Sequence, residues 1–417
     1  MPSIETVAAV LFAIALLHTF ATRLLHRLAH RFPRHQGLFH LLGEVEVVFG
    51  FWALVLVLLM AALSSWGEAV AYVEGRTYTE PLFVFVIMVI AASHPVLETL
   101  RWAIARCARL LPLSNGVATA WLCLALLPLL GSLVTEPAAM TIAALLLAPR
   151  LFRAVLPEPL KYFALGVLFV NISIGGTLTS YAAPPVLMVA SAWQWDSAFM
   201  AATFGWKAAL AVLVNASIAC WLLRKHLGAA PPPEAAQDPV RTPLTVRVVH
   251  LLFLAAVVAT AHHPVVFFGL FLFFLGFTTA YARFQQPLLV KEALLVAFFL
   301  AGLVVLGSMQ QWWLQPLVSS MDSRTLFFGA LGLTAITDNA ALTYLGSLIE
   351  GLSAESRYTL VAGAVAGGGL TVIANAPNPA GVALLRDGFR DGSIGAVPLL
   401  LGALLPTAIA AAAFLLL

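Results

Sequence analysis

Long apolar runs separated by short polar segments extend along the whole chain. Most of the runs reach the roughly 18–20 residues that a helix needs to cross the hydrocarbon core of a bilayer. They predict membrane helices over residues 4–22, 43–65, 81–100, 198–223, 244–262, 264–283, 288–308 and 394–417. Basic residues follow the first run instead of preceding it, which favours a retained helix over a cleaved signal peptide. The fold class predicted by this pattern is an all-α polytopic membrane protein.

Two pairs of apolar pieces interrupt the series of helices. The pieces are residues 115–133 and 138–149 in the first pair, and residues 325–336 and 340–349 in the second. Two full crossings would also return the first pair to the same side, but its second piece, like both pieces of the second pair, has only about 12 residues or fewer and is too short to span a bilayer as a helix. Each pair therefore predicts a re-entrant helical hairpin, over residues 115–150 and 325–350.

A discontinuous helix is predicted after each hairpin, over residues 160–193 and 357–388. Glycines weaken a helix and prolines remove a backbone donor. The first helix is interrupted by Gly175-Gly176 and Ala183-Pro184-Pro185, and the second by Gly367-Gly368-Gly369 and Asn375-Ala376-Pro377-Asn378-Pro379. At membrane depth, broken backbone is tolerated only where it is buried in protein or lines a wet cavity. These two breaks are therefore candidate parts of a transport site.

The same order of elements occurs twice, which predicts two repeats over residues 1–228 and 244–417, joined by a cytoplasmic proline-rich linker at 229–243. Each repeat has three helices, a hairpin, a broken helix and a last helix. The hairpin tips also match in sequence, because Thr135-Glu136-Pro137 aligns with Thr337-Asp338-Asn339 and Ala-Ala follows in both.

The few charges predict the orientation in the membrane. Only 10% of the residues are charged and 61% are hydrophobic, whereas soluble domains carry roughly 25% charged residues. This composition excludes an ordinary soluble enzyme and a nucleic-acid-binding protein. The positive-inside rule places both termini outside and inverts the second repeat relative to the first, with only Arg76, Arg324 and Arg357 outside and Lys207 within a helix. Inverted repeats with helices broken at the midplane are typical of secondary transporters, here expected in a bacterial-type inner membrane.

Glu136 and Asp338 are the strongest candidates for chemistry, because they occupy equivalent tips and an ionisable group inside a membrane is costly. Burial favours the protonated form of a carboxyl group, and a bound cation favours its ionised form. Competition between Na⁺ and H⁺ for one carboxylate is the simplest basis for exchange. The alternative is that both acids only cap the helices that begin at the tips.

Oxygen-bearing side chains near the tips and breaks are candidate ligands, because hard cations prefer oxygen. They are Thr135, Thr337 and Asn339 at the tips, and Thr177, Thr179, Ser180, Thr371, Asn375 and Asn378 at the breaks. Four glycines would allow close backbone approach: Gly175, Gly176, Gly368 and Gly369. All of these residues are equally compatible with ordinary capping and turn formation.

Lys207 lies about ten residues into the predicted helix 198–223. It is a candidate charge partner for Glu136 or Asp338, which a substrate ion would displace, or its stem snorkels to the interface. The cysteines show no disulfide or zinc spacing, and no phosphate loop or cofactor fingerprint is present. We therefore expect no cofactor and no metal beyond a transported cation.

The hairpin tips and the Asn375-Ala376-Pro377-Asn378-Pro379 break resemble the ion transporter superfamily, which includes arsenite-efflux, divalent-anion/Na⁺ symport and Na⁺/H⁺ antiport families. The Asp338-Asn339-Ala340 tip is most similar to the Na⁺/H⁺ antiporter branch. The resemblance implies a homodimer with a scaffold domain and a transport domain that moves as an elevator. Dicarboxylate members carry Ser-Asn-Thr at their tips, whereas the fixed acids here would repel a carboxylate substrate. Pro137 also departs from the usual Asn.

The function that we expect is cation/H⁺ antiport in the lipid bilayer, with Na⁺ or another small cation exchanged for H⁺ at Glu136 and Asp338. The first alternative is an anion or organic-anion transporter on the same scaffold, coupled to Na⁺ or H⁺. In that case the helix N-termini of the hairpins would bind the anion. An alternative of another class is an intramembrane enzyme, for which His94 and Glu98 could share a helix face.

Overall fold

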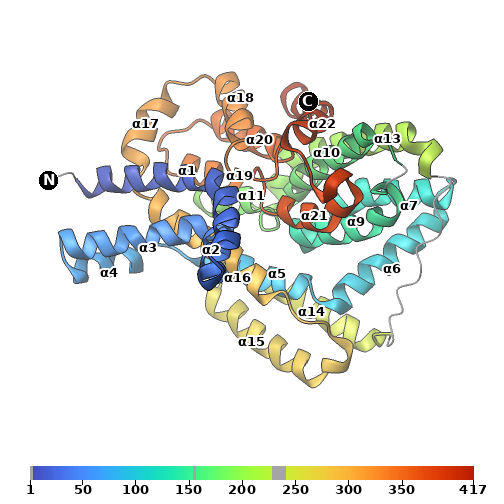
Figure 1. The fold of residues 1–417 in the computed structure, drawn as a ribbon, viewed down its shortest axis with the longest axis horizontal. Coiled ribbons are helices and arrows are strands. Elements are labelled where there is room, and N and C mark those ends of the chain that lie inside the picture. Colours follow the sequence, from blue (N-terminus) through green and yellow to red (C-terminus); the bar gives the residue numbers. More distant parts are fainter. Residues whose placement is uncertain (1–2, 154–155, 228–240) are drawn as a thin grey trace.

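The computed structural model describes residues 3–153, 156–227 and 241–417, and in this part of the chain every regular element is helical. The predicted all-α class is thereby confirmed. The predicted linker 229–243 lies outside the described residues except for its last three. Figure 1 shows the helices in two groups, at the left and bottom and at the right and top of the view.

The first helical group combines helices from both halves of the chain around one hydrophobic core. Its main members are α1 (Ile4–Arg31), α3 (Val45–Leu63), α5 (Thr79–Ala91), α14 (Leu244–Ala259), α15 (Pro264–Ala280) and α16 (Val290–Gly307). Within it α3 packs on α16, and α5 packs on α15 and α16. The short helices α2 (Gln36–Leu42) and α4 (Trp66–Glu74) flank α3.

The second helical group surrounds a second core. Its members from the first half are α6 (His94–Leu110), α7 (Asn115–Leu124), α8 (Leu126–Val134), α9 (Glu136–Leu151), α10 (Glu158–Gly175), α12 (Ser197–Met200) and α13 (Trp206–Leu227). Its members from the second half are α18 (Ser323–Thr334), α20 (Ala354–Gly367), α21 (Asn378–Leu385) and α22 (Ala396–Leu416), with α17 (Gln311–Ser319) leading into α18. Helix α10 packs extensively on α22, and α18 on α20.

Five of the described helices are long and apolar enough to cross a membrane, or up to seven spans if two bent pairs are each counted as one. The chain is therefore an integral membrane protein. Several predicted boundaries are wrong, including that of the piece 115–133, which is two helices, α7 and α8, bent by 41°. The helix expected at 81–100 is two helices, α5 and α6, bent by 64°, because Ser93 is extended and Pro95 has no N–H to continue the ladder. The first helix continues to Arg31, until Pro33 ends it.

The two halves exchange contacts reciprocally at the breaks. Helix α10 ends at Gly175, and α11 (Pro184–Trp193) resumes after the first break; α20 and α21 flank the second break in the same way. Helix α11 packs on α19 (Asn339–Ser347), which follows the second tip, and α21 packs on α9, which follows the first tip. Each tip therefore lies against the break that belongs to the other half.

Candidate functional site

Both tips are the N-termini of short helices that begin inside the protein. Asp338 caps α19, because its Oδ1 accepts hydrogen bonds from the backbone N–H groups of Ala340 (2.7 Å) and Ala341 (3.2 Å). Thr135 caps α9 through its Oγ1, which accepts from Ala138 N at 3.4 Å. Glu136 is the first residue of α9, so capping does not occupy its carboxylate, as it does for Asp338. The positive ends of both helix dipoles favour negative charge at the tips.

The Glu136 carboxylate is completely buried, with 0% of the residue exposed. Its Oε2 accepts a hydrogen bond of 2.8 Å from Asn375 Nδ2 in the second break. Its Oε1 lies so close to Gly176 in the first break that an added Cβ there would collide with it. The first tip and both breaks therefore converge on one carboxylate, and Asp338 is near enough to interact with it electrostatically.

The second tip is held by a matching set of contacts. Asn339 donates its backbone N–H to Ala374 O (3.1 Å) in the second break and its Nδ2 to Ser173 Oγ (3.4 Å) in α10. Gly368 lies against the hydrogen bond between Ser173 and Asn339, because an added Cβ would meet Ser173 Oγ and come within 2.9 Å of Asn339 Nδ2. Ser173 thus links the second tip to α10, two residues before the first break.

Unpartnered acceptors accumulate around this junction. Buried side-chain oxygens normally have a hydrogen-bond partner. Four here have none among the described residues: Glu136 Oε1, Asn339 Oδ1, Asn375 Oδ1 and Asn378 Oδ1. The three amide oxygens accept but cannot donate, and the same holds for the Glu136 oxygen when its carboxyl group is ionised. Such a set suits a proton or a hard cation better than an anion.

The predicted hydroxyl ligands fasten the backbone at the tips and breaks. Four of the hydroxyls donate to backbone carbonyls: Thr177 to Ile174 O, Thr179 to Ser132 O, Thr337 to Leu333 O and Thr371 to Ala335 O. The Ser180 and Ser197 hydroxyls share a hydrogen bond. Asn378 Nδ2 donates to Gly368 O and Thr371 O, both at 2.8 Å, which closes the second break on itself. The atoms nearest to an added Cβ belong to Pro128 at Gly175 and to Val170 at Gly369.

Ser132 is a positioning residue that the sequence did not reveal, because a serine in an apolar helix has no distinctive pattern. It is completely buried. Its Oγ donates to Gly175 O (2.7 Å) and accepts from Leu178 N (2.9 Å), which joins α8 to the first break.

Replacing Ser132 should therefore loosen this break. We expect Ser132→Ala to lower the free energy of unfolding by about 1–3 kcal/mol, because buried backbone groups would lose their partner. Thermal unfolding in detergent measures this loss. Ser320→Ala removes an exposed hydroxyl with one local bond and is the matched control. Equal stability of the two variants would contradict the role of Ser132.

Lys207 is not brought to the acids. Its Nζ donates to Tyr358 Oη (2.9 Å) and lies 4.5 Å from the centre of that ring. Tyr358 Oη in turn donates to Phe414 O (2.7 Å), so Lys207 joins α13 to α20 and α22. The expected charge pairing is therefore replaced by a cation–π and hydrogen-bond contact, because α13 presents Lys207 to α20.

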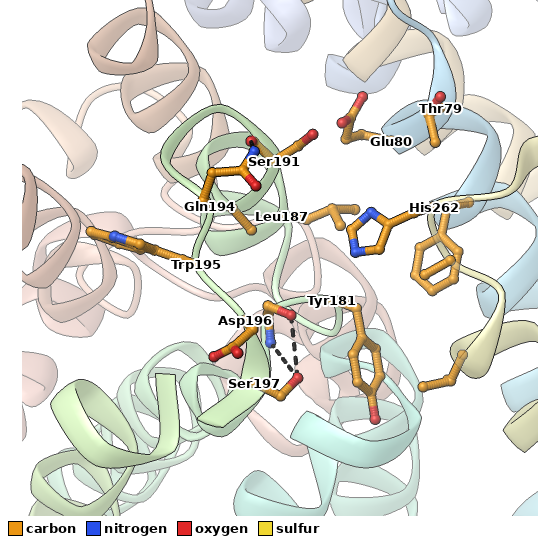
Figure 2. Close-up of a pocket in the computed structure, with 15 residues that line it drawn as sticks. Thr79, Glu80, Tyr181, Leu187, Ser191, Gln194, Trp195, Asp196, Ser197 and His262 are labelled. Atoms are coloured by element: carbon orange, nitrogen blue, oxygen red, sulfur yellow. Dashed lines mark hydrogen bonds between the residues drawn. The ribbon is translucent and has the colours of Figure 1, made fainter. Parts of the chain in front are cut away.

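Two cavities lie at opposite ends of α5 and are named inner and outer after the orientation predicted from the sequence. The inner cavity, of about 310 Å³, is lined near the tip by Thr135 and Pro137 and also by Met88 and Ala92 at the end of α5. The outer cavity, of about 530 Å³, is lined by Thr79 and Glu80 at the start of α5. Figure 2 shows Glu80 and His262 facing Ser191, Gln194 and Asp196 across the outer cavity. Ser197 lies at the bottom of the view and is hydrogen-bonded to Ser180. Each cavity thus lies between the two helical groups.

The inner cavity also contains residues outside the set of sequence-predicted ligands. Glu44, Glu46 and Glu292 line it. Glu44 and Glu46 lie at the start of α3, where an acid at a helix end is ordinarily an interfacial residue. Two acids at the start of a long apolar run were the sequence signal, but only the packing of α3 on α16 places them in a cavity.

The comparisons with known proteins agree with this architecture. A family model described as "Putative Na+/H+ antiporter" matches residues 3–417. No curated protein matches the chain. Because the match covers nearly the whole length, including both tips, both breaks and the helices of both groups, the chain belongs to this antiporter family and is a secondary transporter.

Proposed function

We propose that the protein exchanges Na⁺ or another small cation for H⁺, with Glu136 and Asp338 as the groups that bind both. The observation that carries the proposal is the buried Glu136 carboxylate. One of its oxygens is held by Asn375, and the other has no partner among the described residues. A buried ionised carboxylate is costly unless it is paired. Either a proton or a cation removes that cost, and the two compete for the same oxygen.

Asp338 adds coupling between the two ions. It interacts unfavourably with Glu136 when both are ionised. Without a cation, at least one of the pair is expected to hold a proton. A cation that binds between them stabilises the ionised forms, so the proton leaves as the cation enters. The reverse sequence on the other side of the membrane completes the exchange.

The reciprocal packing supports a mechanism of alternating access. We propose that the halves are inverted repeats, that hairpins 115–150 and 325–350 are re-entrant, and that both termini lie outside an inner membrane. In this proposal the first helical group is the scaffold and the second is the transport domain. The second group, which carries both tips, moves as an elevator past the first in a homodimer. The two cavities at opposite ends of α5 are then the two access routes.

The proposed exchange is tested with purified protein in liposomes that contain a pH-sensitive dye. Na⁺, Li⁺, K⁺ and Ca²⁺ are added in turn, and at least one is expected to drive proton flux. Absence of ion-dependent flux with every cation would overturn the proposal. Flux that required an added organic or inorganic anion would instead favour an anion transporter on the same scaffold.

Asp338→Asn is expected to reduce this flux roughly tenfold or more, because the amide keeps an acceptor for the cap but loses the charge. The cap to Ala340 and Ala341 is retained through the remaining oxygen, so the variant should fold. The initial rate of dye response, compared with wild type across pH, is the measurement. A rate equal to wild type at every pH would remove Asp338 from the mechanism.

A further inference from the structure

A small cavity lies between the two helical groups, directly beside the second tip. Its volume is about 30 Å³, comparable to the space occupied by about one water molecule. Its polar lining consists of Glu46 from α3, Asp338 and Asn375, and the rest is apolar, including Val296 and Phe299 from α16. Glu46 and Val296 also line the inner cavity, so the two cavities are adjacent.

The charges around this small cavity have one sign. The neighbouring inner cavity adds Glu44 and Glu292, and no Lys, Arg or His is among the described residues that line either space. Asp338 is near enough to Glu46 to interact with it electrostatically. None of the ion pairs between described residues involves Glu46, Asp338 or Glu136. Two carboxyl groups that line one small cavity repel each other when both are ionised, and a bound cation or a proton removes that repulsion.

An independent feature points to the same ligand. Asn375 is only 1% exposed and lines the small cavity. Its Nδ2 is used by Glu136, and its Oδ1 has no partner among the described residues. The amide therefore contacts the Glu136 carboxylate with its donor and has a buried acceptor oxygen left for the space that Glu46 and Asp338 share. A hard cation is bound by carboxylate and amide oxygens of this kind.

We propose that Glu46 is a third ion-binding carboxylate, and that Glu46, Asp338 and Asn375 form a transfer site for a small cation between the inner cavity and Glu136. This inference rests on the proposed exchange function. Glu46 belongs to the first helical group, and the other two residues follow α18 and α20 of the second. The site is therefore complete only when the groups are in the present arrangement. Movement of the second group would separate Asp338 from Glu46 and release the ion from this side.

The transfer site predicts an effect on one face of the membrane. In Glu46→Gln, the apparent KM for the cation should rise roughly tenfold when the cation is offered at the face of the inner cavity. The KM at the opposite face and the maximal rate should change much less. The measurement is cation-dependent proton flux in inside-out and right-side-out membrane vesicles. Glu46→Asp keeps the charge and should recover most of the affinity.

Two control variants and a second measurement make the result decisive. Glu44→Gln neutralises an acid of the inner cavity that does not line the small one and should raise KM less than Glu46→Gln. Glu68→Gln removes an exposed acid on α4 and should match wild type. Proton release on adding Na⁺ to weakly buffered protein in detergent reports binding if a variant transports poorly, and Glu46→Gln should then need more Na⁺.

The outcomes separate the two proposals. Exchange by wild type with an unchanged KM in Glu46→Gln at both faces would overturn the transfer site and leave the exchange function intact. A KM raised equally at both faces would also overturn it, because a general structural defect has no sidedness. Absence of cation-dependent flux and proton release in wild type would overturn the exchange function and this inference together.

Discussion

Glu136→Gln is expected to reduce cation-dependent proton flux to the background of protein-free liposomes, a loss of roughly 100-fold or more. The glutamine oxygen can still accept the hydrogen bond from Asn375 Nδ2, so the junction should remain assembled. The side chain can no longer carry a negative charge or exchange a proton. Thermal unfolding should show equal or higher stability, because an unpaired buried carboxylate has been removed. Dye-loaded proteoliposomes and a melting curve provide the two measurements.

The combination of lost transport with retained stability distinguishes a binding group from a packing group. Glu68→Gln is the matched control, because it makes the same change on an exposed surface and should leave both quantities unchanged. Flux above one third of the wild-type rate in Glu136→Gln would remove Glu136 as the ion carrier. Glu136→Asp keeps the charge but moves it away from Asn375 by the length of one methylene. We expect a proton flux between those of Glu136→Gln and wild type, with a shifted dependence of the flux on pH.

Gly176→Ala should have the second largest effect. The added Cβ would collide with Glu136 Oε1 and lie 2.9 Å from Glu136 Cγ and from Ala183 Cβ. The carboxylate must then move off Asn375, or the first break must shift. We expect at least a tenfold loss of flux, together with a loss of about 1–3 kcal/mol in stability from overpacking. Cation titration of the flux should show a raised KM, because the ligand oxygens are displaced.

Two other glycines separate the packing effect from the effect on the carboxylate. Gly175→Ala places a Cβ 2.6 Å from Pro128 O, and its three nearest atoms all belong to Pro128, so it should lower stability with a smaller change in cation KM. Gly269→Ala on α15 has no atom within 4 Å of the new Cβ and should behave as wild type. If Gly175→Ala and Gly176→Ala gave the same rise in KM, the special position of Gly176 would be refuted.

Local signals in the sequence predicted most of the helices and both breaks. Apolar runs of sufficient length predicted the helices, and paired glycines with prolines predicted the breaks between α10 and α11 and between α20 and α21. The bend at Ser93 was missed, because Ser93-His94-Pro95 is only a brief interruption and the two helices together are still apolar enough for one span. Mean hydropathy does not report the direction of a helix axis, whereas an extended residue and a missing backbone N–H are enough to change that direction.

The sequence by itself determined that the chain is helical and membrane-embedded, and it singled out Glu136, Asp338 and Asn375 as candidates. Composition and the free-energy cost of placing a charge in a membrane decide these points, because a bilayer tolerates few ionisable groups. Only the tertiary structure decided which candidates meet. It brought Asn375 to Glu136 across 239 positions, directed Lys207 to Tyr358, and placed Glu46 in a cavity with Asp338. Such contacts depend on how α3, α16 and the two tips pack, and no local pattern encodes that packing.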